Sequence, residues 1–217
     1  MYVGYRYEGF LPGEMYHVCS RGVEQRKIFL NDRDHLRFLS LLHHCLPVGP
    51  IQSYSVAKRL KRKSQNLKEG EGLVDVLVYC LMSNHFHLLV RENVEAGVTR
   101  YFQRLLNSYA RYFNVKYRRS GSLFAGPFRA VAVDGDEYLL HVSRYIHLNP
   151  YVASMVHDPF SYRWSSLGEY TGDSAAGDYC HTAFITGLVS PADYKKFVAD
   201  QADYAREIEG IKHLVLE

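Results

Sequence analysis

A nearly uninterrupted apolar run followed by a short polar turn constrains the fold of this chain most strongly. Residues 73–82 read LVDVLVYCLM, which leaves almost no position for a solvent-facing side chain. Such a run predicts a β-strand buried on both faces. Ser83 and Asn84 are expected to form a tight turn, after which residues 85–91 return as a second strand. The sequence therefore predicts a buried antiparallel hairpin.

The segments around this hairpin alternate between strand and helix patterns. Leucines at helical spacing, from Leu36 to Leu46, predict a helix that begins at Asn31 or Asp32. Asp134 and Glu137 are spaced as a capping box for a later helix, which Pro150 is expected to stop near Leu148. The complete prediction comprises strands at 15–21, 73–82, 85–91 and 128–133, and helices at 31–46, 98–117 and 134–148. This order predicts an α+β, ferredoxin-like sandwich with helices packed on a central antiparallel sheet.

The length of 217 residues suits one domain with appendages. We expect a domain over residues 1–166, interrupted by a basic insertion at 51–72 that contains a short helix. A C-terminal extension follows at 167–217, with a helix over 194–208. The four cysteines are scattered without a CxxC pair, which argues against a zinc knuckle or a disulfide framework.

Composition excludes some classes of protein without selecting one. No stretch approaches the roughly 18 consecutive apolar residues that a membrane span needs, so no membrane partner is expected. The N-terminus lacks the apolar core of a signal peptide, which favours a cytoplasmic location. The formal net charge of +3 is too small to indicate a nucleic-acid partner by itself.

His85-Phe86-His87 is the first pattern that suggests chemistry. Side chains alternate along a strand, so the two imidazoles point the same way, about 7 Å apart at their backbones, while Phe86 faces the opposite side. Two imidazoles in this arrangement suit one divalent ion with open positions. A chance pair in a chain with 11 histidines is the alternative.

Tyr145 lies in the predicted helix that Pro150 follows. A spacing of four residues places His141, Tyr145 and Asn149 on one helix face. The carboxamide oxygen of Asn149 could complete an ion shell beside two imidazoles. Taken alone, Tyr145 is better explained as a packing residue, given how often tyrosines are buried.

Basic residues recur along the chain together with 18 tyrosines, a combination that suits phosphate contact and base stacking. Arg100, Arg104 and Arg111 share one face of the helix predicted over 98–117. The other candidates for DNA contact are Lys61 and Arg62 in the basic insertion, and Arg118, Arg119 and Arg129. A solvated charged surface is the alternative for each.

Two motifs together resemble the HUH single-tyrosine transposases, and most closely the REP-associated tyrosine transposase branch. They are residues 82–89 (MSNHFHLL) and, far downstream, residues 144–150 (RYIHLNP). Residues 16–22 (YHVCSRG) and 162–166 (YRWSS) also resemble that branch, so the resemblance covers about residues 15–166. Insertion-sequence relatives carry glutamine at the position of Asn149.

The resemblance implies the HUH endonuclease fold and a DNA transposase that cleaves and rejoins single-stranded, hairpin-flanked DNA. It assigns Tyr145 as the nucleophile of a 5′-phosphotyrosine intermediate. His85, His87 and Asn149 would bind Mg²⁺ or Mn²⁺. A monomer is favoured over a dimer, because the C-terminal extension could cover the surface that a partner would use.

Two other functions remain open at this point. A domesticated nucleic-acid-binding regulator would keep the fold without strand transfer, although binding alone does not require His85, His87, Tyr145 and Asn149 together. A hydrolase using a metal-bound water would need further His or Asp ligands, and none stands out.

Overall fold

The four predicted strands form one antiparallel sheet. The computed structural model describes residues 9–60, 67–172 and 178–215. The strands pair in the order β2-β3-β1-β4 and comprise β1 (Met15–Arg21), β2 (Val74–Leu81), β3 (His85–Glu92) and β4 (Arg129–Val133). With helices following β1 and β3 in the chain, this order is ferredoxin-like. The predicted α+β sandwich is thereby confirmed.

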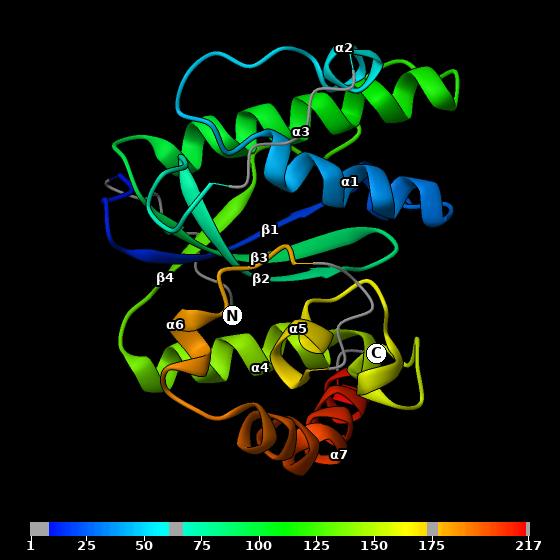
Figure 1. The fold of residues 1–217 in the computed structure, drawn as a ribbon. Coiled ribbons are helices and arrows are strands. Elements are labelled where there is room, and N and C mark those ends of the chain that lie inside the picture. Colours follow the sequence, from blue (N-terminus) through cyan, green and yellow to red (C-terminus); the bar gives the residue numbers. More distant parts are fainter. Residues whose placement is uncertain (1–8, 61–66, 173–177, 216–217) are drawn as a thin grey trace.

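Helices cover both faces of the sheet, so the molecule has three layers (Figure 1). One layer contains α1 (Asp32–His44) and α3 (Gly97–Lys116), with the short helix α2 (Tyr54–Arg59) inside the predicted insertion. The other layer contains α4 (Asp136–Val152), α5 (Leu167–Thr171), α6 (Ala183–Thr186) and α7 (Pro191–Val215). Two short 3₁₀ turns lie at Val23–Gln25 and Pro159–Ser161. None of the helices in the described ranges is long and apolar enough to cross a membrane.

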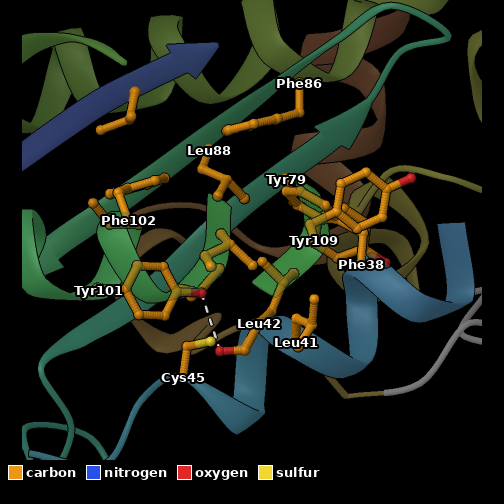
Figure 2. Close-up of a cluster of buried hydrophobic side chains, with 14 of the residues drawn as sticks. Phe38, Leu41, Leu42, Cys45, Tyr79, Phe86, Leu88, Tyr101, Phe102 and Tyr109 are labelled. Carbon is orange, nitrogen blue, oxygen red and sulfur yellow. Dashed lines mark hydrogen bonds between the residues drawn. The ribbon is translucent and has the colours of Figure 1, made fainter. Parts of the chain in front are cut away.

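The face of the sheet beneath α1 and α3 carries an aromatic core (Figure 2). Phe38 packs against Phe86 and Tyr109, with ring centroids 5.0 and 5.1 Å away. Two of the buried tyrosine hydroxyls bond to backbone: that of Tyr101 donates to the Leu42 carbonyl over 3.0 Å, and that of Tyr109 donates to the Ile28 carbonyl. This face is therefore a mainly apolar packing surface.

The opposite face carries a second apolar cluster that the C-terminal extension completes. Leu77 and Leu89 of the sheet, Ile146 of α4 and Val198 of α7 belong to this one buried cluster. The C-terminal extension thus shares a core with the sheet. The domain boundary after residue 166 stays a prediction.

Helix α4 departs from its predicted limits at both ends. Its first cap residue is Gly135, at φ 84° and with no side-chain cap hydrogen bond, so the predicted Asp134–Glu137 capping box is wrong. Pro150 lies inside the helix, which continues to Val152. Tyr151, in that last turn, is buried and donates from its hydroxyl to Asp203 of α7 over 2.7 Å. Tertiary contacts therefore stabilise the turn after the proline.

The predicted leucine stripe of α1 also needs one correction. Leu39, Leu42 and Leu46 are buried as expected, but Leu36 is 48% exposed. The buried side of α1 is formed instead around Phe38 and Leu41, because the helix turns this side toward the sheet and α3.

Candidate catalytic site

Strand β3 presents His85 and His87 on the face that α4 covers. Phe86, between them, is buried in the aromatic core on the other face. The two imidazole centroids lie 5.0 Å apart. In the antiparallel register with β1, His87 lies opposite Cys19 and His85 opposite Arg21. The predicted convergence of the two histidines is present in the structure.

Each of these imidazoles uses its Nδ1 atom in a hydrogen bond. His85 Nδ1 lies 2.7 Å from Asn84 Oδ1, while the Asn84 amide nitrogen donates to the Gln25 carbonyl. Since the amide oxygen can only accept, His85 carries its proton on Nδ1 and the lone pair on Nε2. His87 Nδ1 lies 2.9 Å from Nε2 of His17, a residue of β1. This donor set suits a divalent ion bound through the two Nε2 atoms.

Burial keeps these histidines uncharged at neutral pH. Desolvation lowers the pKa of His17 to about 4, and desolvation with the nearby Arg21 charge lowers the pKa of His85 to about 4. The pKa of His87 is lowered well below its ordinary value, first by burial and then by the neighbouring His17 and His85. A neutral imidazole is the form that binds a metal ion. No group of three or more His, Cys, Asp or Glu side chains within the described ranges forms a metal shell, so further ligands would have to be of another kind.

Tyr145 of α4 lies across these histidines. Its ring is edge-on to His17 and His87, at centroid distances of 5.9 and 5.8 Å. The residue is 48% exposed, so a substrate can approach it. Tyr109, by contrast, is fully buried in the aromatic core and donates to the Ile28 carbonyl over 2.6 Å. Of these two tyrosines, only Tyr145 lies beside the histidine pair.

Asn149 lies one helical turn beyond Tyr145, as predicted. Its amide nitrogen donates to the Tyr145 carbonyl over 2.8 Å, which leaves the carboxamide oxygen outside this bond. The side chain is half-buried. An oxygen ligand could therefore come from the same helix as the tyrosine.

Three of the arginines expected to contact DNA lie on the opposite side of the sheet from these residues. Arg100 donates to the Val48 carbonyl, and Arg104 to the carbonyls of Pro47 and Gly49, on the α1/α3 side of the sheet. Arg111 is exposed on that same helix. The guanidinium groups of Arg100 and Arg104 thus hold the loop after α1.

The remaining basic candidates are divided. Arg119 donates to Asn114 and Ser122, whereas Arg118 is exposed. Lys61 and Arg62 lie outside the described residues. Arg129 of β4 is exposed and lies opposite Cys19, which puts it on the same face of the sheet as the histidines.

Sequence reasoning missed two residues of this site, His17 and Arg21. Both lie on β1 and alternate with its buried residues, so they share the histidine face. The alternation of His17, Cys19 and Arg21 was visible in the sequence. Their neighbours on β3 depend on strand register, which no local pattern specified.

Comparison with known proteins gives one family match, over part of the chain. Residues 50–149 match the family described as "Transposase IS200 like". No curated protein matches the chain. Among solved structures, the chain is similar to the REP-associated tyrosine transposase bound to a REP hairpin, with 13% identity, 83% of this chain and 90% of that chain covered, and a TM-score of 0.49. It is also similar to tRNA(His) guanylyltransferase from Saccharomyces cerevisiae, with 11% identity, coverage of 89% and 74%, and a TM-score of 0.38.

Both structural likenesses are distant, and the sequence match over residues 50–149 is the more specific finding. That match spans the hairpin with His85 and His87 and the helix with Tyr145, and it ends at Asn149. Over residues 50–149, the chain is therefore similar to the IS200-like transposases.

Proposed function

We propose that this protein is a DNA transposase that cleaves and rejoins single-stranded DNA at hairpin-flanked sites through a 5′-phosphotyrosine on Tyr145. The observation that carries the proposal is the position of the half-exposed Tyr145 ring, edge-on to His87 at 5.8 Å. A phenol beside a pair of neutral imidazoles brings a nucleophile and an ion site to one phosphate.

The residues fit a divalent ion, Mg²⁺ or Mn²⁺. His85 and His87 would bind it through Nε2, because their Nδ1 atoms are already hydrogen-bonded. Asn149 would add its carboxamide oxygen. When bound, such an ion polarises a non-bridging phosphate oxygen and neutralises the charge that develops there.

The chain supplies the nucleophile for the first chemical step and the leaving group for the second. The Tyr145 oxygen attacks phosphorus, a new phosphorus–oxygen bond forms, and the bond to the 3′ oxygen breaks. The departing 3′ oxygen takes up a proton and the 5′ phosphate stays on the tyrosine. A 3′-hydroxyl of another strand then attacks this phosphotyrosine and releases Tyr145. Bond energy is retained in the covalent link, so no nucleotide cofactor is required.

DNA contact near the site is assigned to Arg21 and Arg129. Both are exposed and extend from strands on the histidine face, beside His85 and Cys19. Arg118 is a further exposed candidate. Arg100, Arg104, Arg111 and Arg119, with Lys61 and Arg62 of the basic insertion, stay as candidates for a second contact region.

We further propose that Tyr145 acts within its own chain in a monomer. Helix α4 packs on α7 through His147, whose Nδ1 lies 2.8 Å from the Tyr194 hydroxyl, and through Tyr151 and Asp203. Exchange of α4 with a partner would have to break these buried contacts.

Covalent trapping on labelled DNA tests the proposal. Wild type with Mn²⁺ should form a denaturant-resistant adduct on a hairpin-bearing single strand and much less on a perfect duplex. Tyr145→Phe should bind the same DNA and form no adduct, because the ring volume is unchanged while the hydroxyl is lost. Tyr109→Phe is the matched control and should still form it.

An adduct in Tyr145→Phe that is absent in Tyr109→Phe would show that the nucleophile is misassigned. Binding without cleavage by every variant, wild type included, would favour a regulator that has kept the fold. Cleavage without any adduct would favour a water nucleophile. An adduct formed by wild type in excess EDTA would exclude the ion site.

A further inference from the structure

We infer that His17 is a positioning residue that fixes the protonation pattern and orientation of His87 for ion binding. This inference rests on the ion site proposed above. It starts from one contact: His17 Nε2 lies 2.9 Å from His87 Nδ1, and the two rings stack with centroids 5.1 Å apart at 22°. His17 belongs to neither of the motifs that contain the proposed ligands and nucleophile.

The number of protons on two neutral imidazoles determines which one donates in this contact. A neutral imidazole has one N–H donor and one acceptor nitrogen. His87 can offer the Nε2 lone pair to an ion only when its proton lies on Nδ1. That Nδ1–H must then donate to His17 Nε2, so His17 carries its own proton on its Nδ1. The reverse arrangement, with His17 donating, would place a proton on His87 Nε2 and block the ion.

For His85, the hydrogen bond at Nδ1 is accepted by a group that cannot act as the donor. The Asn84 oxygen only accepts, and its amide nitrogen is committed to the Gln25 carbonyl. His17 Nε2 can accept a hydrogen bond only while the proton of His17 lies on Nδ1. The tautomer of His87 therefore depends on the tautomer of His17, whereas that of His85 is fixed by Asn84. Partners of this kind contribute about 10- to 100-fold to metal affinity in other sites.

His17 is held firmly enough to perform this role. It lies within β1, between the buried residues Tyr16 and Val18, in a strand paired on both sides. Its ring also lies edge-on to Tyr145, at 5.9 Å. One side chain thus contacts both the proposed ligand and the proposed nucleophile before any ion binds.

The test is calorimetric titration of the full-length protein with Mn²⁺ alone, in the absence of DNA. His17→Ala should weaken Mn²⁺ binding about 10- to 100-fold. His17→Gln should recover most of the affinity, because its carboxamide oxygen can accept from His87 Nδ1–H. Thermal unfolding of each variant confirms that it is folded. His87→Ala is the reference for a lost ligand.

The ¹⁵N shifts of the imidazoles in the metal-free wild type give a second readout that does not depend on a variant. Protonation of His87 at Nδ1 is expected, and protonation at Nε2 would overturn the inference. Equal Mn²⁺ affinity in His17→Ala and wild type would overturn it too, while loss of binding in His87→Ala still supported the ion site. If His17→Gln binds as weakly as His17→Ala, acceptance of the hydrogen bond is not the role. If wild type binds no Mn²⁺, this inference and the ion site both fail.

Discussion

The two faces of the sheet differ in what they do with aromatic and polar side chains. Phe86 and His87 are neighbours on β3, yet one lies in a dry aromatic core and the other beside the exposed Tyr145. Tyr109 and Tyr145 show the same division: the first bonds to backbone inside the core, and the second lies half-exposed. The comparison teaches that an alternating strand can serve packing and chemistry at once, one residue apart.

The largest expected contrast follows from replacing these two neighbours. His87→Ala should abolish DNA cleavage while leaving hairpin binding and folding largely intact, since the imidazole is a proposed ligand of the ion. Phe86→Ala should lower the free energy of unfolding by about 3–5 kcal/mol, because it leaves a cavity under α1 and α3. Denaturant unfolding and cleavage assays on both variants measure the contrast.

His85→Ala provides the control, since the same loss of cleavage is expected from the second ligand. Full cleavage by His87→Ala, or an unfolding free energy reduced as much as in Phe86→Ala, would remove the distinction between the two faces.

A smaller contrast concerns one buried carboxyl group in each helix layer. Burial raises the pKa of Glu169 in α5 to about 7, against the two backbone N–H groups that bond to it. For Asp34 in α1, burial raises the pKa, but hydrogen bonds from Lys116 and Tyr117 outweigh it and lower the pKa. The two groups should therefore act on stability in opposite directions.

The sign follows from proton linkage. Because the pKa of Glu169 is raised in the folded state, its contribution to the free energy of unfolding is fully present below about pH 4.5 and is lost as pH rises through about 7. Glu169→Gln should therefore unfold less readily than wild type at pH 8, by on the order of 1 kcal/mol. Asp34→Asn should be destabilised at pH 8, with the deficit shrinking as pH falls. Denaturant unfolding between pH 4 and 8 tests both, and a Glu169→Gln curve parallel to wild type would refute the assignment.

The smallest expected effect separates the arginines of the two faces. Arg129→Ala should weaken binding of hairpin DNA about threefold and reduce the salt dependence by about one phosphate contact, with Arg21→Ala behaving alike. Arg104→Ala should change DNA affinity less, because its guanidinium already bonds to the loop after α1. Binding titrations over a range of salt concentrations measure this, and equal losses would place the DNA on both faces.

Local periodicity was sufficient for much of the candidate site. Alternation along one strand predicted that His85 and His87 share a face, and the helical repeat predicted that Asn149 follows Tyr145 by one turn. The buried hairpin and the order of elements were likewise readable, because each depends on residues close in sequence.

Contacts between distant segments could not be read in this way. The pairing of His17 with His87 depends on the register between β1 and β3, which only the folded sheet specifies. Arg104 matched a phosphate-binding pattern as well as Arg129 did, but its guanidinium group donates to a carbonyl of the loop after α1. The helical turn after Pro150 was missed because α7, far along the chain, stabilises it.

The alternation of β3 also bears on how errors in this chain would be expressed. If β3 slipped by a single position against β1, Phe86 would move to the catalytic side and two imidazoles would enter the aromatic core. Buried, unpaired imidazoles would destabilise such a form strongly. Molecules with β3 in the wrong register would thus unfold rather than persist as a folded form able to bind DNA. An insertion or deletion of one residue in this strand would therefore impair both stability and the proposed strand transfer.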